Sequence, residues 1–265
     1  MAARAGTWAG PYGVIMLTKD LAICIRAVDY SETSQVVTFF ARHAGKIGMI
    51  VKGSKRAKSA FDGPIEVLSH GKIVFADSGR EKLATLTEFE RAYAIPDLAG
   101  PGGDVFVLNC CYFAAELLSH LTHDYDPHPE LFDSFLDFLE NAGRHGTSRR
   151  MLAALILFQL GLLREIGLQP ILSACANCKT EYAQRNTQYE TYFSSSANGL
   201  ICRDCESSFP DKIRLNKSAA ACLIRLKQIP DAAEETLREI ENILVRHFTE
   251  LLGHPPKMAR HVLGG

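Results

Sequence analysis

Two pairs of cysteines, Cys175-Ala-Asn-Cys178 and Cys202-Arg-Asp-Cys205, constrain this chain more than any other feature. Two residues between cysteines allow one tight turn to direct both sulfurs at a single point, and two such turns can enclose one ion. Four thiolates around Zn²⁺ form a tetrahedral site with Zn–S bonds of about 2.3 Å and no position for a substrate. We therefore predict one structural Zn²⁺ held by Cys175, Cys178, Cys202 and Cys205.

The residues between the two pairs predict a small hairpin, because residues 189–193 alternate like a strand and residues 194–199 are typical of a turn. Disulfides, unrelated free thiols and redox chemistry are the alternatives, but a redox Cys-x-x-Cys is expected at a strand-to-helix junction of a βαβ unit, and this pattern is absent. The other cysteines lie in apolar periodic segments and are predicted to be small buried side chains: Cys24, Cys110, Cys111 and Cys222. A thiolate cage with scattered free thiols indicates a reducing compartment.

The bulk composition is that of an ordinary globular protein. The chain has 265 residues, of which 47% are hydrophobic and 22% are charged, with a formal net charge of −1. No apolar stretch approaches the roughly 20 residues that a membrane span needs. Residues 1–16 contain no apolar signal-peptide core, and we expect them to form a flexible extension.

The first ninety or so residues have the pattern of a β-barrel. Short segments rich in β-branched and aromatic residues alternate with turn signals, and they cover residues 21–28, 35–41, 46–52, 72–76 and 82–89. Strands of this number and length, with a basic segment between the third and the fourth, predict a small closed barrel of the OB-fold type.

Beyond residue 101 the hydrophobic period changes from 2 to 3.6. Asp104 and Thr147 are predicted N-caps of two helices, and residues 130–141 predict another helix between them. Residues 216–228 and 231–252 predict two more, with Asp231 as N-cap of the last in a box-like arrangement with Glu234. The predicted fold is therefore α+β and multidomain, with helices that a cysteine module interrupts.

A run of cations in the middle of the predicted barrel is the main functional candidate. No acidic residue occurs between Glu32 and Asp62, whereas six cations do: Arg42, Lys46, Lys52, Lys55, Arg56 and Lys58. Such segregated charge gives one face a positive field despite a neutral sum. Cations along a barrel face can follow a phosphate backbone, so the pattern favours nucleic-acid binding over a merely solvated loop.

No convincing catalytic constellation accompanies this surface. His120 and His123 have helical spacing and precede Asp124 and Asp126, but no further ligand is evident, so we interpret them as surface or capping residues. The phosphate-binding Gly-x4-Gly-Lys-Ser/Thr motif does not occur. The sequence therefore indicates a binding protein and not an enzyme.

Several of these segments resemble the RecO family of bacterial recombination mediators. Residues 27–34, and residues 40–56 with a Gly-Lys pair before a strand that ends in Lys-Gly, are similar to the N-terminal part of that family. Residues 158–170, which lead into the first cysteine pair, and residues 246–254 are similar to its later part. The resemblance covers most of the chain beyond residue 16.

The resemblance implies a non-catalytic, cytoplasmic and nucleoid-associated DNA-binding mediator of the RecF pathway of recombinational repair. It implies binding and annealing of single- and double-stranded DNA, contacts with RecR and with the C-terminal tail of single-strand-binding protein, and help in loading RecA. The six cations named above are then the expected phosphate contacts.

The alternatives are a zinc-stabilised adaptor whose main ligand is a protein or a structured RNA, and a metallo-enzyme with an open site. The expected divisions are an extension (1–16), an OB-fold (17–92), a helical domain (101–174 and 212–253), a zinc-knuckle module (175–211) and a tail (254–265).

Overall fold

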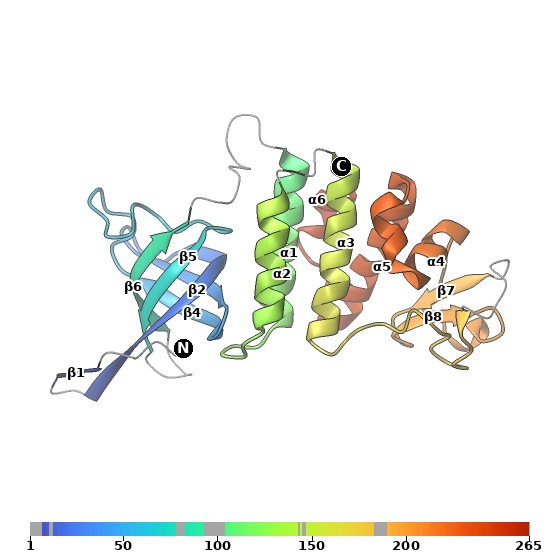
Figure 1. The fold of residues 1–265 in the computed structure, drawn as a ribbon, viewed down its shortest axis with the longest axis horizontal. Helices are drawn as coiled ribbons and strands as arrows, with labels where there is room; N and C mark the ends of the chain where they lie inside the picture. Colours follow the sequence, from blue (N-terminus) through green and yellow to red (C-terminus); the bar gives the residue numbers. More distant parts are fainter. Residues whose placement is uncertain are drawn as a thin grey trace. The chain divides into compact units, whose positions relative to one another are not determined.

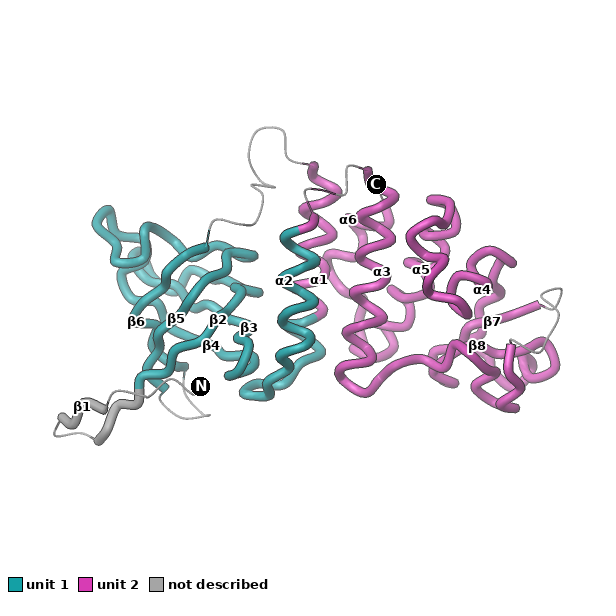
Figure 2. Tube along the Cα trace, viewed as in Figure 1, with its two compact units in different colours: residues 1–96, 118–140 teal, residues 97–117, 141–265 magenta. Residues whose placement is uncertain are grey.

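The computed structural model describes residues 7–10, 13–77, 83–92, 104–142, 144, 147–182 and 190–264. These residues fall into two compact units (Figure 2). The first unit contains residues 1–96 and 118–140, and the second contains residues 97–117 and 141–265. Residues 118–140, which we expected in the helical domain, thus group with the strands.

The first unit is built around a closed barrel. Its sheet has the order β1-β2-β3-β4-β6-β5, and β5 pairs back to β2 (Figure 1). The strands are β1 (Thr7–Gly10), β2 (Gly13–Asp29), β3 (Gln35–Ala41), β4 (Gly45–Val51), β5 (His70–Ala76) and β6 (Ala84–Arg91). Only β4 and β6 pair in parallel, among the described strands of this sheet. The predicted OB-like barrel is confirmed.

One long strand closes the barrel. Leu17–Ile23 of β2 pairs with β5, and Ala22–Asp29 pairs with β3. The register shifts between Cys24 and Arg26, which is the irregularity that allows one strand to turn from one neighbour to the other. Alternation along β3 and β4 then directs one row of each strand into the core: Val37, Phe39, Ala41, Ile47, Met49 and Val51.

The start of the chain forms an additional pair of strands. Backbone pairing joins Thr7 to Met16 and Gly10 to Gly13, so β1 and the first part of β2 form an antiparallel pair. The extension that we expected over residues 1–16 thus contains a pair of strands over residues 7–10 and 13–16. Residues 1–6 and 11–12 lie outside the described residues.

The helices follow the predicted periodicity closely. They are α1 (Val105–Leu121), α2 (Pro129–Ala142), α3 (Ser148–Glu165), α4 (Lys217–Ile224), α5 (Glu234–Leu252) and α6 (Ala259–Leu263). Asp104 Oδ1 accepts a hydrogen bond from the Phe106 amide at 2.8 Å, and the Thr147 side chain accepts one from the Arg150 amide, so both predicted N-caps are confirmed.

The prediction for the last two long helices was partly wrong. Helix α4 ends at Ile224 and not at Gln228, and a 3₁₀ helix, η3 (Leu226–Asp231), follows it. Asp231 lies inside η3, and the N-cap of α5 is Ala233, which makes no side-chain capping bond. Pro230 lies inside η3, because its fixed φ and its missing amide are compatible with a short 3₁₀ helix.

The second unit contains a small sheet beside its helices. Strands β7 (Thr191–Ser194) and β8 (Gly199–Cys202) form the predicted hairpin, and β9 (Ile213–Arg214) pairs with β7. The four cysteines outside the two Cys-x-x-Cys pairs are buried, as predicted: Cys24, Cys110, Cys111 and Cys222. Among the described residues, none of the helices has the length and apolarity that crossing a membrane requires.

Candidate functional site

Two tight turns position the four cysteines of the second unit. In the first turn the Lys179 amide donates to the Cys175 carbonyl at 2.9 Å, and in the second the Cys205 amide donates to the Cys202 carbonyl at 3.0 Å. Lys179 adopts a positive φ of 62°, which brings the chain back on itself after Cys178. A backbone hydrogen bond thus closes a tight turn twice, between residues four apart before the hairpin and between residues three apart at the end of β8.

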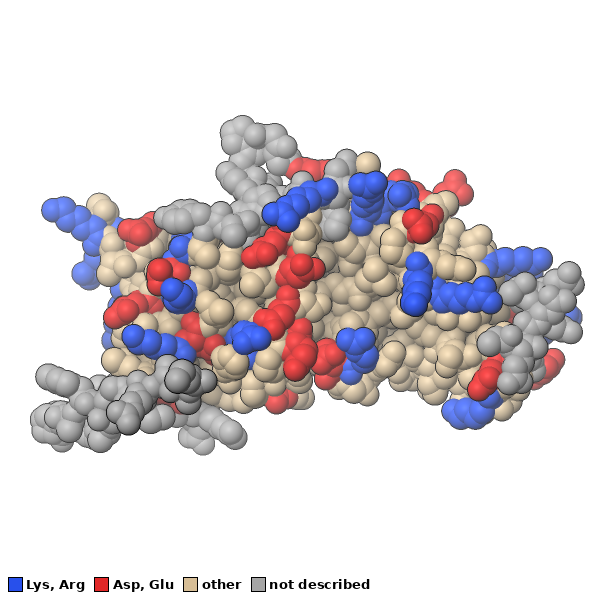
Figure 3. Space-filling model, viewed as in Figure 1, with Lys and Arg blue, Asp and Glu red and all other residues tan. Residues whose placement is uncertain are grey.

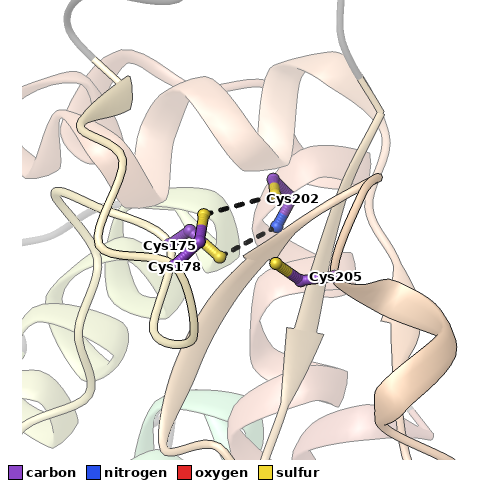
Figure 4. Close-up of side chains that lie close together, drawn as sticks. All are labelled: Cys175, Cys178, Cys202 and Cys205. Carbon is purple, nitrogen blue, oxygen red and sulfur yellow. Dashed lines mark hydrogen bonds between the residues drawn. The ribbon is translucent and has the colours of Figure 1, made fainter.

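The two turns face each other across a small space (Figure 4). The four sulfurs all lie within 4.8 Å of one another. Cys178 Sγ lies 3.8 Å from Cys202 Sγ, and the Cys202 amide donates to Cys175 Sγ at 3.4 Å. Tetrahedral coordination with bonds of about 2.3 Å places sulfurs roughly 3.8 Å apart, so this set of ligands can hold one metal ion.

The local environment acts on the sulfurs in opposite directions. A hydrogen bond with Thr180 at 3.3 Å lowers the pKa of Cys178 to about 6, whereas burial raises the pKa of Cys202 to about 12. A divalent cation favours the thiolate form at every ligand, which overcomes the cost of burying Cys202 as an anion. Because protein sulfurs supply four ligands, the site leaves no position for a catalytic water.

The second candidate for a metal site was the pair His120 and His123 with the acidic residues that follow them. Among the described residues, the four cysteines are the one set of three or more histidine, cysteine or acidic side chains that lie close enough to share an ion. Asp124 pairs with Lys46, and Asp126 pairs with His128 at 3.2 Å. The structure therefore does not bring His120, His123 and these carboxylates together as a metal site.

The predicted cations divide into two groups in the first unit. Four of them lie on the segment that leaves β4, residues 52–69, and all four are exposed residues: Lys52, Lys55, Arg56 and Lys58. Among the described residues, no ion pair or side-chain hydrogen bond engages Lys52, Arg56 or Lys58. Lysine and arginine side chains project from the rim of the barrel in Figure 3, whereas acidic side chains gather over α2. We call residues 52–58 the basic loop.

A buried glutamine fixes the segment that carries the basic loop. Gln35 is 5% exposed at the start of β3. Its Oε1 accepts hydrogen bonds from Ser54 Oγ and from the Ile65 amide, both at 2.9 Å, and its Nε2 donates to the Ile65 carbonyl at 3.2 Å. Phe61, Ile65 and Leu68 are buried in the same segment. The backbone is thus held from beneath while the cations point to solvent.

Lys55 links the basic loop to the turn between β2 and β3. Its amide donates to the Thr33 carbonyl at 3.2 Å, and its ammonium lies 2.6 Å from the Asp29 carboxylate. The Lys55 and Asp29 side chains remain 29% and 65% exposed, so water screens this ion pair. The loop and the turn therefore form one continuous surface.

The two remaining cations are engaged by other parts of the first unit. Arg42 makes a bidentate ion pair with Asp133 of α2, with Nε–Oδ1 at 2.8 Å and Nη2–Oδ2 at 2.7 Å. This hydrogen bonding raises the pKa of Arg42 and lowers the pKa of Asp133. The Arg42 side chain is only partly exposed, and the two best donor positions of its guanidinium are already occupied.

Lys46 has a structural role in the same unit. Its side chain is 13% exposed, and its ammonium donates to the carbonyls of Ser119 at 2.8 Å and Thr122 at 2.6 Å and lies 3.4 Å from Asp124. It thus binds the carbonyls at the C-terminal end of α1, where a cation is favoured. The structure corrects our expectation here, because this ammonium is not available to a phosphate.

The structure adds two residues to the basic surface that the sequence analysis did not select. Arg26 of β2 is exposed and has no ion-pair partner among the described residues, and Tyr30 is 68% exposed just beyond the same strand. Their even spacing with Val28 could have indicated a shared outward face. The shift of register at Cys24 hides this pattern, because buried residues occur consecutively before it.

The comparison with known families and proteins agrees with this architecture. The family model described as "Recombination protein O N terminal" matches residues 16–94, and the model described as "Recombination protein O C terminal" matches residues 103–260. The chain belongs to the RecO family. The two matched regions correspond to the barrel and to the segment that contains the helices and the cysteine pairs.

Individual RecO proteins cover nearly the whole chain. The chain is 30% identical over 242 residues to "DNA repair protein RecO" of Anaeromyxobacter dehalogenans, which covers 89% of this chain and 91% of that protein. It is 29% identical over 246 residues to the protein of the same name from Bacillus pumilus, with 90% of each chain covered. The protein of that name from Bacillus subtilis is 28% identical over 90% of this chain and 91% of its own.

Proposed function

We propose that this RecO family member is a non-catalytic mediator of recombinational DNA repair that binds DNA strands and brings complementary strands together. The family name of its relatives, DNA repair protein, supports the process. The observation that carries the DNA contact is the basic loop, where four exposed cations stand on a backbone that Gln35 holds in place.

Electrostatic attraction is the mechanism that this surface supports best. Each phosphate that a lysine or arginine neutralises releases a condensed counterion, which favours binding in dilute salt irrespective of sequence. A protein that screens the charge of two polyanionic strands at once lowers the repulsion between them. Annealing then follows from charge screening and proximity, and it needs no covalent step.

We also propose the protein contacts of such a mediator. Displacing single-strand-binding protein requires a direct contact with it, and we propose that its C-terminal tail binds the second unit. RecR is the proposed partner with which this protein helps RecA load onto coated DNA. These partners rest on the family alone.

Zn²⁺ is the metal that we propose for the cysteine site. Four sulfur ligands at tetrahedral spacing suit Zn²⁺, which has no redox chemistry and stabilises structure when its coordination is closed. Cys175, Cys178, Cys202 and Cys205 would hold it and so brace the hairpin of β7 and β8. In this role the ion stabilises the fold of the second unit and does not touch the DNA.

An annealing assay tests the proposed function directly. Complementary strands are coated with single-strand-binding protein, and duplex formation is followed by fluorescence with and without this protein at increasing salt. We expect acceleration that declines as salt rises, because phosphate contacts weaken with ionic strength. Absence of both annealing and oligonucleotide binding in dilute buffer would refute the proposal. Tight binding of a protein or structured RNA that persists at high salt, without annealing, would instead support the zinc-stabilised adaptor.

A further inference from the structure

The outer face of the barrel carries a small apolar platform next to the basic loop. The registers of three neighbouring strands align Val28 with Val36 and Val36 with Ile50. Val28 is 46% exposed, and Val36 and Ile50 are partly exposed. Three apolar side chains from β2, β3 and β4 thus lie in one row on the solvent side of the sheet.

Tyr30 stands at the edge of this platform. It follows Val28 by two positions, so strand alternation places it on the same side. The Tyr30 amide donates to the Ser34 carbonyl at 3.0 Å, which fixes the turn that presents the ring. The side chain is 68% exposed, and among the described residues it makes no hydrogen bond or ring contact. A large, exposed aromatic ring held on an ordered turn in this way is a candidate contact for a ligand.

Cations border the platform on both sides. Arg26 aligns with Thr38 and Thr38 with Gly48 in the row on one side of the platform. Lys52 follows Ile50 on the other side, and Lys55 joins the turn that carries Tyr30. An aromatic ring on an apolar platform between cations matches the chemistry of an unpaired strand, whose bases are flat and apolar and whose backbone is anionic.

We propose that Tyr30 stacks on a base of single-stranded nucleic acid and thereby makes this face prefer single strands over duplex. The inference rests on the proposed function, since it assigns a base contact to the surface whose phosphate contacts that function requires. A duplex cannot offer its bases in this way, because they are already stacked inside the helix. The basic loop binds both kinds of nucleic acid, and Tyr30 adds affinity only for unpaired bases.

The test uses the full chain and three probes of equal length: a fluorescent oligodeoxythymidylate, an abasic deoxyribose-phosphate strand and a duplex. We expect Tyr30→Ala to lower affinity for the oligodeoxythymidylate about tenfold, within the range of one stacking contact. Affinity for the abasic strand and the duplex should not change. Tyr30→Phe should retain the wild-type affinity, because the ring and not the hydroxyl makes the contact.

A tryptophan at the same position gives a second readout. Tyr30→Trp should show fluorescence quenching when oligodeoxythymidylate binds and none with the abasic strand, with Trp8 of the wild-type protein as the background. Equal loss of affinity for the base-bearing and abasic strands in Tyr30→Ala would overturn the inference, as would wild-type binding to oligodeoxythymidylate. If that variant binds normally while substitution of the basic loop abolishes binding, only the stacking inference fails. If the wild-type protein binds none of the probes, the proposed function itself fails.

Discussion

The basic loop and the cysteine turns are both irregular segments held by a buried polar centre, but the centres are built differently. In the barrel the centre is the side chain of Gln35, a residue of β3, which bonds to the backbone of the segment above it. In the second unit the centre consists of the turns' own side chains, the four sulfurs. The first arrangement leaves Lys52, Arg56 and Lys58 without an ion-pair partner among the described residues, so they are available to a ligand. In the second arrangement the cysteine side chains themselves form the centre.

Among the changes considered, removal of one cysteine sulfur should have the largest effect on stability. Cys175→Ser deletes a buried ligand, and structural zinc sites contribute apparent free energies on the order of 10 kcal/mol. We expect loss of bound zinc and rapid proteolysis within the cysteine module, measured by metal analysis and limited digestion. Cys222→Ala is the matched control, because Cys222 is buried and is not a ligand. A Cys175→Ser protein with one zinc per chain and unchanged stability would refute the structural role.

The second unit contains a third buried polar centre, and only part of its hydrogen-bonding capacity is satisfied among the described residues. Glu241 of α5 is fully buried and accepts a hydrogen bond from Gln159 Nε2 at 2.8 Å, while its Oε2 has no partner among the described residues. Burial raises the pKa of Glu241 from 4.5 to about 7. The folded state therefore keeps the proton between about pH 4.5 and 7 while the unfolded state loses it, and stability falls as pH rises through this window.

Glu241→Gln should remove this pH dependence. The raised pKa corresponds to about 3 kcal/mol between pH 4.5 and pH 7. Relative to the wild type, the variant should gain stability by this order as pH rises from 5 to 8, in urea unfolding at each pH. Glu250→Gln, at an exposed position of the same helix, is the control. Parallel pH profiles for Glu241→Gln and the wild type would show that Glu241 is ionised in the folded protein.

Substitution of Gln35 tests whether its side chain supports the basic loop. Gln35→Ala leaves Ser54 and both backbone groups of Ile65 without their partner, which costs about 2 kcal/mol. We expect lower thermal stability together with weaker oligonucleotide binding, because the basic loop loses its support. Gln228→Ala, at an exposed site of the second unit, should change neither quantity. Normal DNA affinity in a destabilised Gln35→Ala protein would show that DNA binding by the basic loop does not depend on Gln35.

The smallest effect is expected at Arg42. Exposed ion pairs contribute roughly 0 to 1 kcal/mol, so Arg42→Ala should barely change the unfolding midpoint. Its guanidinium is occupied by Asp133, and we expect its loss to weaken oligonucleotide binding less than Lys52→Ala does. Equilibrium binding at one low salt concentration compares the two variants. The reverse order would mean that DNA displaces Asp133 from Arg42.

Local patterns in the sequence were enough to predict much of this molecule. Strand alternation and turn residues located the barrel strands, and cysteine spacing located the four sulfurs that can hold a metal ion, because in both cases the residues follow a short spacing or a fixed period. Asp104 and Thr147 were predicted as N-caps for the same reason, since a cap bonds to an amide two or three residues away.

Contacts between distant residues could not be read in this way. Lys46 binds carbonyls at residues 119 and 122, and Arg42 binds Asp133, so only the folded first unit shows that these cations are already engaged. The platform beside Tyr30 depends on the strand register, which a shift at Cys24 changes. A charge pattern thus located the basic region but did not distinguish free cations from occupied ones.

The salt dependence of DNA binding tests the central claim most directly. A variant with Lys52, Lys55, Arg56 and Lys58 all replaced by alanine is compared with a charge-matched control in which four exposed cations of the second unit are replaced: Lys217, Lys227, Arg246 and Lys257. We predict weaker binding of oligodeoxythymidylate for the loop variant. The slope of log K against log salt concentration should also become shallower by up to about 3, because each of four single-strand phosphate contacts contributes about 0.7 to this slope. Equal affinity and equal slope in the loop variant and the wild type would contradict the account.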